Sequence, residues 1–466
     1  MGLPVPDSRT DNSLPAAWPR LAATGVDSEF LAWFAERTTA THCRTDRIPL
    51  TDLRGWSFDD ATGNLRHESG RFFVVEGLQV RTSYGQVPEW SQPIINQPEI
   101  GFLGLLVKEV DGVLHCLVQA KMEPGNVNPV QLAPTIQATR SNYTRVHRGS
   151  STRYLDYFLH PQGRRVLVDV LQSEQGSWFH RKRNRNIVIQ VTEDVPVAED
   201  HHWLSLGEIG RLLRVDGLVN MDTRTVLSCL PLTALYDRAA GRCERAPTAL
   251  TRSLTAEDGA CHDLSDVLSW FTHAKSRYEM ATNRIPLNQV RGWHRTRDEI
   301  AHDEGRHFSI IGVSVHASSR EVISWDQPIL YPKGQGVVAF LIKSIGGVAH
   351  LLVQARFQAG LVDGIEMGPT VQCHRDNYPL GPPRFLDEVL NAPAERILFD
   401  TVLPEEGGRF YHAANRYMLV EVDDDFPVGV PEDFCWVTRR QLIELLRHSY
   451  YLNVEARSLM ACLQSL

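Results

Sequence analysis

Runs of apolar and β-branched residues predict several β-strands in this chain. Residues 102–110 and 113–121 form two such runs, and Asp111-Gly112 separates them. An Asp-Gly pair between two strand-like runs is typical of a two-residue hairpin turn. Two later runs meet in the same way at Gly346-Gly347. The pattern therefore predicts one long β-hairpin in each half of the chain.

Four other segments carry apolar residues at helical spacing. They are residues 206–213, 221–230, 441–446 and 454–463. Cys229 and Cys462 lie at matching places in two of these segments, and we expect them to be reduced core residues. Strands mixed with helices predict an α/β or α+β fold, with a mixed β-sheet covered by helices.

Five short sequence motifs recur in the same order in the two halves. They are Leu-x-Trp-Phe at 31–34 and 268–271, Arg-Ile-Pro-Leu at 47–50 and 284–287, Trp-x-Gln-Pro-Ile at 90–94 and 325–329, Leu-Val-Gln-Ala at 117–120 and 352–355, and Pro-Thr-x-Gln at 134–137 and 369–372. Chance does not produce so many matches in one order, so the chain is a tandem duplication of one module. The expected division is a polar lead over 1–26, copy one over 27–232, a linker over 233–263 and copy two over 264–466.

Composition narrows the classes of function. The chain has 466 residues and a formal net charge of −8. Because clustered Lys and Arg drive nucleic-acid binding, this charge argues against a nucleic-acid partner. The longest apolar stretch, residues 100–107, is too short for a membrane helix, and the N-terminus lacks a signal-peptide pattern. A cytoplasmic protein with no membrane partner is expected.

No motif in the chain predicts a metal or a redox cofactor. The eight cysteines include no C-x-x-C, and H-E-x-x-H is absent. Gly334-x-Gly336-x-x-Ala339 fits a dinucleotide fingerprint, but it opens a β-rich run instead of joining a strand to a helix. Glu405-Glu406-Gly407 is similar to the acidic end of a Nudix box, but the helix carrying the rest of that box is missing. We expect neither a metal nor a cofactor.

Three clusters carry candidate chemistry in copy one, and each has a less specific interpretation. Alternation along residues 113–121 puts His115, Gln119, Lys121 and then Glu123 on one face, which is either a solvated sheet face or an acid–base surface. The density of charged groups favours the second interpretation.

The second cluster, Arg140-Ser141-Asn142-Tyr143-Thr144-Arg145 with His147 behind it, suits a nucleoside diphosphate. Arg can bind phosphate oxygens with two parallel hydrogen bonds, and hydroxyl groups can orient the ligand. The alternative is a polar turn. Copy two keeps Arg375, Asn377 and Tyr378.

The third cluster contains Glu174, Lys182 and Arg183, and is either a solvated basic hairpin or a group that neutralises negative charge. Copy two has Ala413 where copy one has Lys182, and Ala414 where copy one has Arg183. Trp56 and Trp293 follow Arg-Gly in both copies; a core position is the commoner fate of such a Trp, and stacking on a base is the alternative.

Residues 105–149 and 169–186 resemble the signature blocks of the NDP-hexose 2,3-dehydratases, and the resemblance covers nearly the whole chain from Glu29 onward. It implies a dimeric cytoplasmic enzyme with two Nudix-like domains per subunit, acting on a dTDP-linked 4-keto-6-deoxyhexose without a cofactor. It also implies that one of two sugar-nucleotide pockets is the working site. The alternatives are a metal-dependent nucleotide-sugar hydrolase and a non-catalytic sugar-nucleotide sensor.

The implied reaction removes the C3 proton, expels the C2 hydroxyl and gives a 3,4-diketo-2,6-dideoxyhexose, which a 3-ketoreductase is expected to consume. We expect the working site in copy one, with Glu123 or Glu174 as base, His147 or Tyr143 as acid, and Lys182 at the enolate oxygen. The expected substrate-binding residues are Trp56, Gln137, Arg140, Ser141, Asn142, Thr144, Arg145 and Arg183, with Trp293, Gln372, Arg375, Asn377 and Tyr378 in the second pocket.

Overall fold

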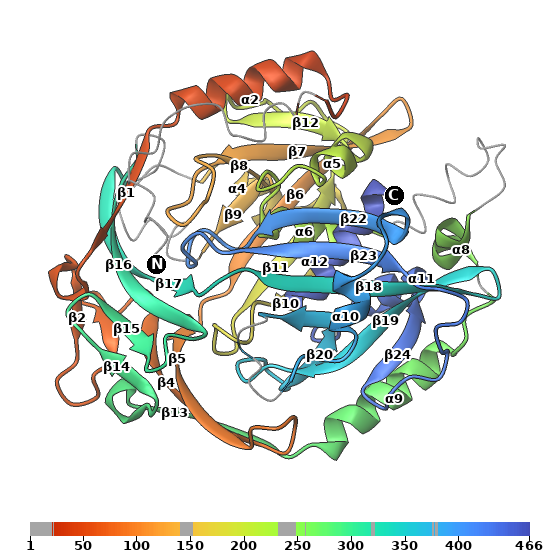
Figure 1. Cartoon of the computed structure of the whole chain (residues 1–466). Coiled ribbons are helices and arrows are strands. Elements are labelled where there is room, and N and C mark those ends of the chain that lie inside the picture. The colour runs from red at the N-terminus through yellow and green to blue at the C-terminus, as the bar shows by residue number, and fades with distance from the viewer. Residues whose placement is uncertain are drawn as a thin grey trace.

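The computed structural model describes residue 21 and residues 23–139, 152–231, 248–256, 258–317, 322–374, 377 and 381–466. Its elements repeat in the same order in two halves (Figure 1). The first half contains α2 (Ser28–Ala40), β1 (Cys43–Ile48), η1 (Leu50–Asp52), β2 (Trp56–Phe58), β3 (Leu65–His67), β4 (Val74–Thr82), β5 (Glu89–Asn96), β6 (Gly101–Val110), β7 (Val113–Lys121), β8 (Gln131–Ala133), β9 (Ile136–Ala138), α4 (Leu155–Leu159), β10 (Arg165–Ser173), β11 (Arg183–Gln190), β12 (His201–Ser205), α5 (Leu206–Leu212) and α6 (Met221–Ser228).

The second half follows a short helix, α8 (Ala249–Thr255). It contains α9 (Leu264–Arg277), β13 (Met280–Ile285), η2 (Leu287–Gln289), β14 (Trp293–Arg295), β15 (Glu299–His302), β16 (Phe308–Ala317), β17 (Ser324–Pro332), β18 (Gly336–Ile345), β19 (Val348–Phe357), β20 (Ile365–Gly368), β21 (Val371–Cys373), α10 (Leu386–Leu390), η4 (Ala394–Arg396), β22 (Ile397–Pro404), β23 (Ala414–Glu421), β24 (Phe434–Thr438), α11 (Arg439–Leu445), α12 (Val454–Cys462) and η5 (Leu463–Ser465). None of the described helices is long and apolar enough to cross a membrane.

The predicted hairpins and helices are confirmed. Strands β6 and β7 turn at Asp111 and Gly112, with φ of 51° and 77°, and β18 and β19 turn at Gly346 and Gly347, with φ of 58° and 79°. Two successive residues with positive φ match the right-handed twist of the strands on either side. Helices α5, α6, α11 and α12 begin and end within two residues of the predicted segments.

Each half has a seven-stranded mixed sheet. In the first half the order is β10-β11-β6-β7-β12, with β8 paired to β7 and β9 to β6, and only the β11–β6 pair is parallel. The second half repeats this as β22-β23-β18-β19-β20, with β21 beside β18 and β24 beside β19. The predicted mixed α/β architecture with two similar halves is confirmed, whereas the Nudix-like relationship of the module stays a prediction.

The two halves exchange strands. Strand β1 of the first half pairs with β16 of the second, and β13 of the second pairs with β4 of the first (Figure 1). Each exchange completes a five-stranded antiparallel sheet. The modules are therefore interlocked, although their sequences follow one another along the chain.

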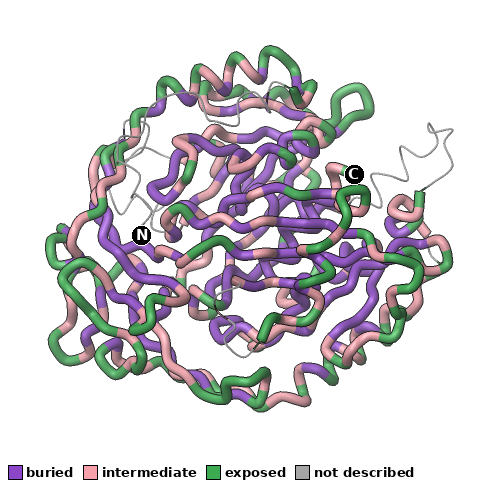
Figure 2. Tube along the Cα trace, viewed as in Figure 1, coloured by how far each residue is buried: buried purple, intermediate pink, exposed green. Residues whose placement is uncertain are grey.

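One core runs through both halves. Helices α6 and α12 pack on each other between the two large sheets, where the buried residues of Figure 2 are concentrated. Two fully buried arginines cross this contact: Arg224 Nη2 donates to the carbonyl oxygen of Pro404 at 2.7 Å, and Arg457 Nη2 donates to that of Ser173 at 2.5 Å. Each half thus binds the end of a strand in the other half: Arg224 holds the end of β22, and Arg457 holds the end of β10.

The segment predicted as a linker contains a helix that the sequence pattern did not predict. Helix α8 contacts β19 and α11, and its Ser253 Oγ accepts a hydrogen bond from the backbone N–H of Arg439 at 2.9 Å. Leu254 is 5% exposed and belongs to the common core. The described part of this segment is therefore packed against the second half.

Candidate active site

Two cavities, related by the duplication, lie where the halves interlock. The first has a volume of about 830 Å³ and the second about 1400 Å³. Residues of copy one provide most of the first cavity, including Trp56, Lys121, Glu123, Gln137, Lys182, Asn184 and Asp222. Copy two closes it with Trp325, Asp326, Gln327, Glu406, Gly408 and Arg409. The first cavity is thus built from both halves.

Glu123 follows the end of β7, where Pro124-Gly125 turns the chain. Its Oε1 accepts a hydrogen bond from Gln137 Nε2 at 2.8 Å and lies 3.9 Å from Lys121 Nζ. The side chain is 6% exposed. An amide N–H and an ammonium group thus lie beside the same carboxyl oxygen of Glu123, which places this side chain as a candidate proton acceptor.

The position of Gln137 depends on a helix cap. The Asn220 side chain accepts a hydrogen bond from the backbone N–H of Thr223 at the start of α6, and its Nδ2 donates to Gln137 Oε1 at 3.3 Å. Copy two repeats the arrangement, since Asn453 caps α12 and donates to Gln372 Oε1 at 2.9 Å. The duplicated N-caps therefore orient the duplicated glutamines.

Lys182 and Glu174 lie on the two sides of the turn between β10 and β11. Lys182 is 5% exposed, lines the first cavity and donates from Nζ to the carbonyl oxygen of Glu99 at 2.5 Å. Burial lowers the pKa of Lys182, while the carboxyl groups of Glu406 and Glu174 oppose that effect. A buried ammonium group beside carboxyl groups can stabilise negative charge that develops on a ligand.

Glu174 is not part of the cavity wall. It is 2% exposed and its Oε1 accepts a hydrogen bond from Asn184 Nδ2 at 2.7 Å, so Asn184 lines the cavity with Glu174 behind it. Burial, and then the neighbouring Glu406, raise the pKa of Glu174 to about 8. The geometry favours Glu123 over Glu174 as the group that contacts a ligand.

Two further carboxyl groups reach the first cavity. Asp222 is in the first turn of α6 and is 3% exposed, and burial raises its pKa well above the ordinary value. Glu406 comes from the loop between β22 and β23 in copy two. Burial raises the pKa of Glu406; the guanidinium of Arg409 counteracts this and the carboxylate of Glu123 adds to it.

Trp56 is an aromatic residue in the lining of the first cavity. Trp56 is 8% exposed, packs edge-on against His67 and donates from Nε1 to the carbonyl oxygen of Asp326 at 2.9 Å. Arg54 donates to both carboxylate oxygens of Asp326 at 2.8 Å, and these hydrogen bonds lower the pKa of Asp326 to about 2. Trp56 thus belongs to the core, as the commoner interpretation predicted, and also lines the cavity.

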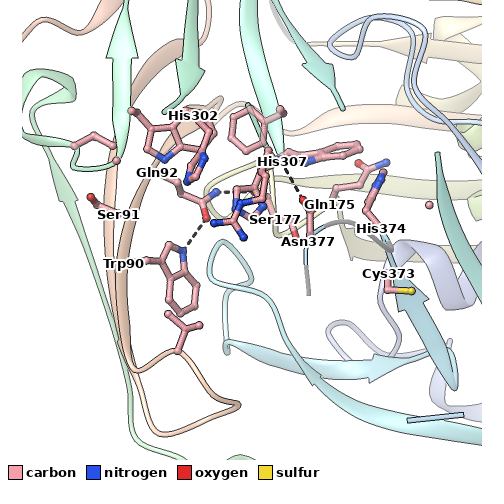
Figure 3. Close-up of a pocket in the computed structure, with 18 of the residues that line it drawn as sticks. Trp90, Ser91, Gln92, Gln175, Ser177, His302, His307, Cys373, His374 and Asn377 are labelled. Carbon is pink, nitrogen blue, oxygen red and sulfur yellow. Dashed lines mark hydrogen bonds between the residues drawn. The ribbon is translucent and has the colours of Figure 1, made fainter. Parts of the chain in front are cut away.

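The second cavity is larger than the first and carries different charged groups. Figure 3 shows Trp90, Ser91 and Gln92 of copy one reaching into this cavity of copy two, with Gln92 Nε2 donating to the Ser177 carbonyl oxygen at 2.9 Å. Gln358, Ala413, Gln175 and Trp178 stand where the first cavity has Glu123, Lys182, Glu406 and Arg409. Glu405 remains, but its carboxylate accepts hydrogen bonds from Gln175, Asn415 and Tyr417.

Apart from Glu174 and Arg183, which line neither cavity, the predicted site residues divide into three groups. Trp56, Glu123, Gln137 and Lys182 meet at the first cavity, and Trp293, Gln372 and Asn377 meet at the second. Arg140, Ser141, Asn142, Tyr143, Thr144, Arg145, His147, Arg375 and Tyr378 lie outside the described residues. The residues on either side of the longer of these segments, Thr139 and Thr152, both line the first cavity.

Two residues lie elsewhere than the sequence pattern indicated. Arg183 lines neither cavity; its Nη1 donates instead to the hydroxyl of Tyr450 in copy two at 2.5 Å. His115 is at the far end of β7, where its ring nitrogen contacts the Val113 carbonyl oxygen. An alternating strand puts residues on one face, but it does not decide how far along the strand a cavity extends.

Sequence reasoning missed Asp222, Glu406 and Arg409, and it named Lys121 without a role. The Glu406 and Arg409 positions carry a signal in hindsight, since their counterparts Gln175 and Trp178 differ in charge. However, these two residues could not be assigned to the first cavity without knowing that the halves exchange strands. Among the described residues, no group of three or more His, Cys, Asp or Glu side chains is arranged to hold a metal ion.

Comparison with known proteins agrees with the duplicated architecture. The family model described as NDP-hexose 2,3-dehydratase matches residues 27–230 and again residues 264–463. Both halves of the chain therefore match the same model.

Three relatives are named dTDP-4-dehydro-6-deoxy-alpha-D-glucopyranose 2,3-dehydratase. The protein from Saccharopolyspora spinosa is 54% identical over 445 residues, covering 94% of this chain and 91% of the relative. That from Streptomyces violaceoruber is 54% identical, covering 94% and 97%, and that from Amycolatopsis orientalis is 48% identical, covering 93% and 89%. These names support neither the hydrolase nor the sensor alternative. The chain belongs to the NDP-hexose 2,3-dehydratase family, and its members are carbon–oxygen lyases.

Proposed function

We propose that this protein removes the C2 hydroxyl of dTDP-4-keto-6-deoxyglucose in deoxysugar biosynthesis, giving the 3,4-diketo-2,6-dideoxy sugar nucleotide. The observation that carries the proposal is the similarity to the three named dehydratases over 93–94% of this chain. The C4 ketone acidifies the C3 proton and the C2 hydroxyl is β to that ketone, so an acid, a base and a cation suffice. The first cavity contains all three kinds of group.

We propose the first cavity as the working site and the second as a nucleotide-binding pocket without this activity. The support is the difference in charged groups. In the repeat, the positions of Glu123, Lys182 and Arg409 are taken by Gln358, Ala413 and Trp178, and of these three Trp178 lines the second cavity. An amide, a methyl group and an indole cannot carry the proton and stabilise the enolate in the same way.

Within the first cavity, Glu123 is the base that removes the C3 proton, and Lys182 lies at the C4 oxygen. Lys121 supports this role of Glu123, because its ammonium nitrogen lies 3.9 Å from Oε1 of the carboxyl group. Glu174 acts behind Asn184, whose amide it holds. The candidate acids His147 and Tyr143 lie outside the described residues.

The nucleotide is bound by Trp56 and Gln137 together with the predicted segment from Arg140 to Arg145. Its counterpart in the second cavity is the set Trp293, Gln372, Arg375, Asn377 and Tyr378. The division into copies at 27–232 and 264–466, the homodimer, the cytoplasmic location and a 3-ketoreductase that consumes the product belong to the same proposal. They follow from the family resemblance and the repeat.

The test is incubation of the purified protein with dTDP-4-keto-6-deoxyglucose in excess EDTA, with a 3-ketoreductase present to trap the diketone. Mass spectrometry should detect a product that has lost one water. Formation of dTMP and a sugar phosphate, or loss of turnover in EDTA, would instead favour a metal-dependent hydrolase. Free dTDP alone decides nothing, because the untrapped diketone is expected to release it.

A further inference from the structure

The elimination needs an acid as well as a base. Once the base has taken the C3 proton, the enolate electrons form the C2–C3 double bond and break the C2–O bond. The departing hydroxyl must then gain a proton to leave as water. Tautomerisation of the resulting enol adds a proton to C2 and removes one from O3, which restores both protein groups without any oxidant or reductant. A positioned acid typically contributes ~10²–10⁴-fold to such a step.

Glu406 has the geometry of such an acid. Its side chain lines the first cavity, and within the described residues its Oε2 is buried and has no hydrogen-bond partner. A Cβ placed at Gly408 would lie 3.3 Å from Oε1 of Glu406 and 3.5 Å from Oε1 of Glu123. The two carboxyl groups therefore face one small space, which the missing side chain of Gly408 leaves open.

The surroundings of the two groups differ. Glu123 accepts a hydrogen bond from Gln137 and lies beside Lys121, whereas Oε2 of Glu406 has no hydrogen-bond partner among the described residues. Burial raises the pKa of Glu406 and the carboxylate of Glu123 adds to this, although Arg409, Lys182 and Lys121 counteract it. Two neighbouring carboxyl groups cannot both ionise easily in a low-dielectric site. Environments that differ in this way assign one carboxyl group as base and the other as acid.

Among the described residues, Asp222 is a second candidate acid in the cavity, and the repeat distinguishes it from Glu406. The counterpart of Asp222 is Glu455, so the second cavity keeps a carboxyl group at that position. The counterpart of Glu406 is Gln175, an isosteric amide that cannot donate a proton as an acid. The proposed acid, Glu406, is thus found together with Glu123 and Lys182, and all three are replaced by uncharged residues at the corresponding positions of the repeat.

We infer that Glu406, supplied by copy two to the cavity of copy one, is the general acid that protonates the departing C2 hydroxyl. This inference rests on the proposed function and assigns a catalytic residue to each half of the chain. A single copy could not complete the working site, which gives a reason for both copies to be kept on one chain.

The test compares Glu406→Gln with Glu123→Gln and with Glu366→Gln. Glu366 is a buried carboxyl group of copy two that lines neither cavity, so it controls for the loss of a buried carboxyl group. Each variant receives the natural substrate and its 2-deoxy-2-fluoro analogue, whose fluoride leaves without needing a proton. Deuterium uptake at C3 of recovered substrate in D₂O measures proton removal by the base.

For Glu406→Gln we expect kcat on the natural substrate to fall ~10²–10⁴-fold, turnover of the fluoro analogue to stay within a few-fold of wild type, and deuterium to enter C3. Glu123→Gln should lose activity on both substrates together with C3 exchange, and Glu366→Gln should resemble wild type. Near wild-type activity of Glu406→Gln, or loss of fluoro turnover and C3 exchange with dTDP binding intact, would overturn the inference. Failure of wild type to release water would instead contradict the proposed function itself.

Discussion

Gln137 donates a hydrogen bond from Nε2 to Oε1 of Glu123 at 2.8 Å, and this contact marks the chemical difference between the two cavities. In the second cavity the corresponding residues are Gln372 and Gln358, so the glutamine is kept and the carboxylate is lost. Gln137→Leu should therefore slow proton removal without abolishing it, because the carboxylate would lose the donor that orients it but keep Lys121. We expect kcat to fall roughly ten- to a hundredfold, since a hydrogen bond to a charged group typically contributes ~1.5–3 kcal/mol.

Steady-state kinetics with the natural substrate measures this loss. A kcat equal to that of wild type would show that the hydrogen bond from Gln137 does not assist Glu123 in proton removal.

Lys182→Ala should lower kcat by at least ~10², or about 2.7 kcal/mol, if the ammonium stabilises the enolate more than the neutral ketone. The control is Arg416→Ala. Arg416 belongs to copy two and donates to both carboxylate oxygens of Asp400 at the surface. That variant should stay within a few-fold of wild type. A loss confined to KM for Lys182→Ala would mean that it binds the ground state and transition state equally.

Calorimetry with dTDP should find close to two sites per chain. Trp56 and Gln137 line one cavity, and Trp293 and Gln372 line the other, so the framework expected to hold the nucleotide is present twice. Gln372→Ala combined with Asn377→Ala should reduce the number to about one. A wild-type stoichiometry of one that this double variant leaves unchanged would remove nucleotide binding from the second cavity.

The contribution of Glu366 to the free energy of unfolding should fall as the pH rises from about 4.5 to about 7. Burial raises the pKa of Glu366 from 4.5 to about 7, although a hydrogen bond from Ser173 Oγ at 2.6 Å partly offsets this. Between these values the folded state holds a proton that the unfolded state has released, so raising the pH favours unfolding.

Glu366→Gln mimics the protonated side chain. Its melting temperature relative to wild type should therefore rise between pH 5 and pH 8, and differential scanning fluorimetry measures this difference. A difference that stays constant over the range would show that Glu366 is ionised in the folded protein at neutral pH.

Gly125→Ala should destabilise the contact between the halves. The backbone N–H of Gly125 donates to the carbonyl oxygen of Gly407 at 2.7 Å, and a Cβ there would lie 1.9 Å from the carbonyl oxygen of Phe410. Because the clashing atom belongs to the backbone and cannot move by a rotamer change, we expect the free energy of unfolding to fall by the upper end of the ~1–3 kcal/mol typical of overpacking. Gly429→Ala, which has open space around its Cβ, is the control for thermal unfolding. Equal melting temperatures for the two variants would contradict this account of the interlock.

The sequence alone determined the duplication, the hairpins at Asp111-Gly112 and Gly346-Gly347, and the helices that carry Cys229 and Cys462. These features are local or repeated, because turn chemistry and apolar spacing act over a few residues. It also brought Glu123 and Lys182 forward as candidates, since both stand where copy two has an uncharged residue.

Only the tertiary structure decided which residues share a cavity. The exchange of β1 and β13 and the crossing of Arg224 and Arg457 are set by contacts between residues far apart in the chain, on which local sequence patterns carry no information. For this reason Glu406 lies in the cavity of copy one, although its sequence belongs to copy two. Arg183, next to the buried Lys182, contacts Tyr450 of copy two and not the cavity.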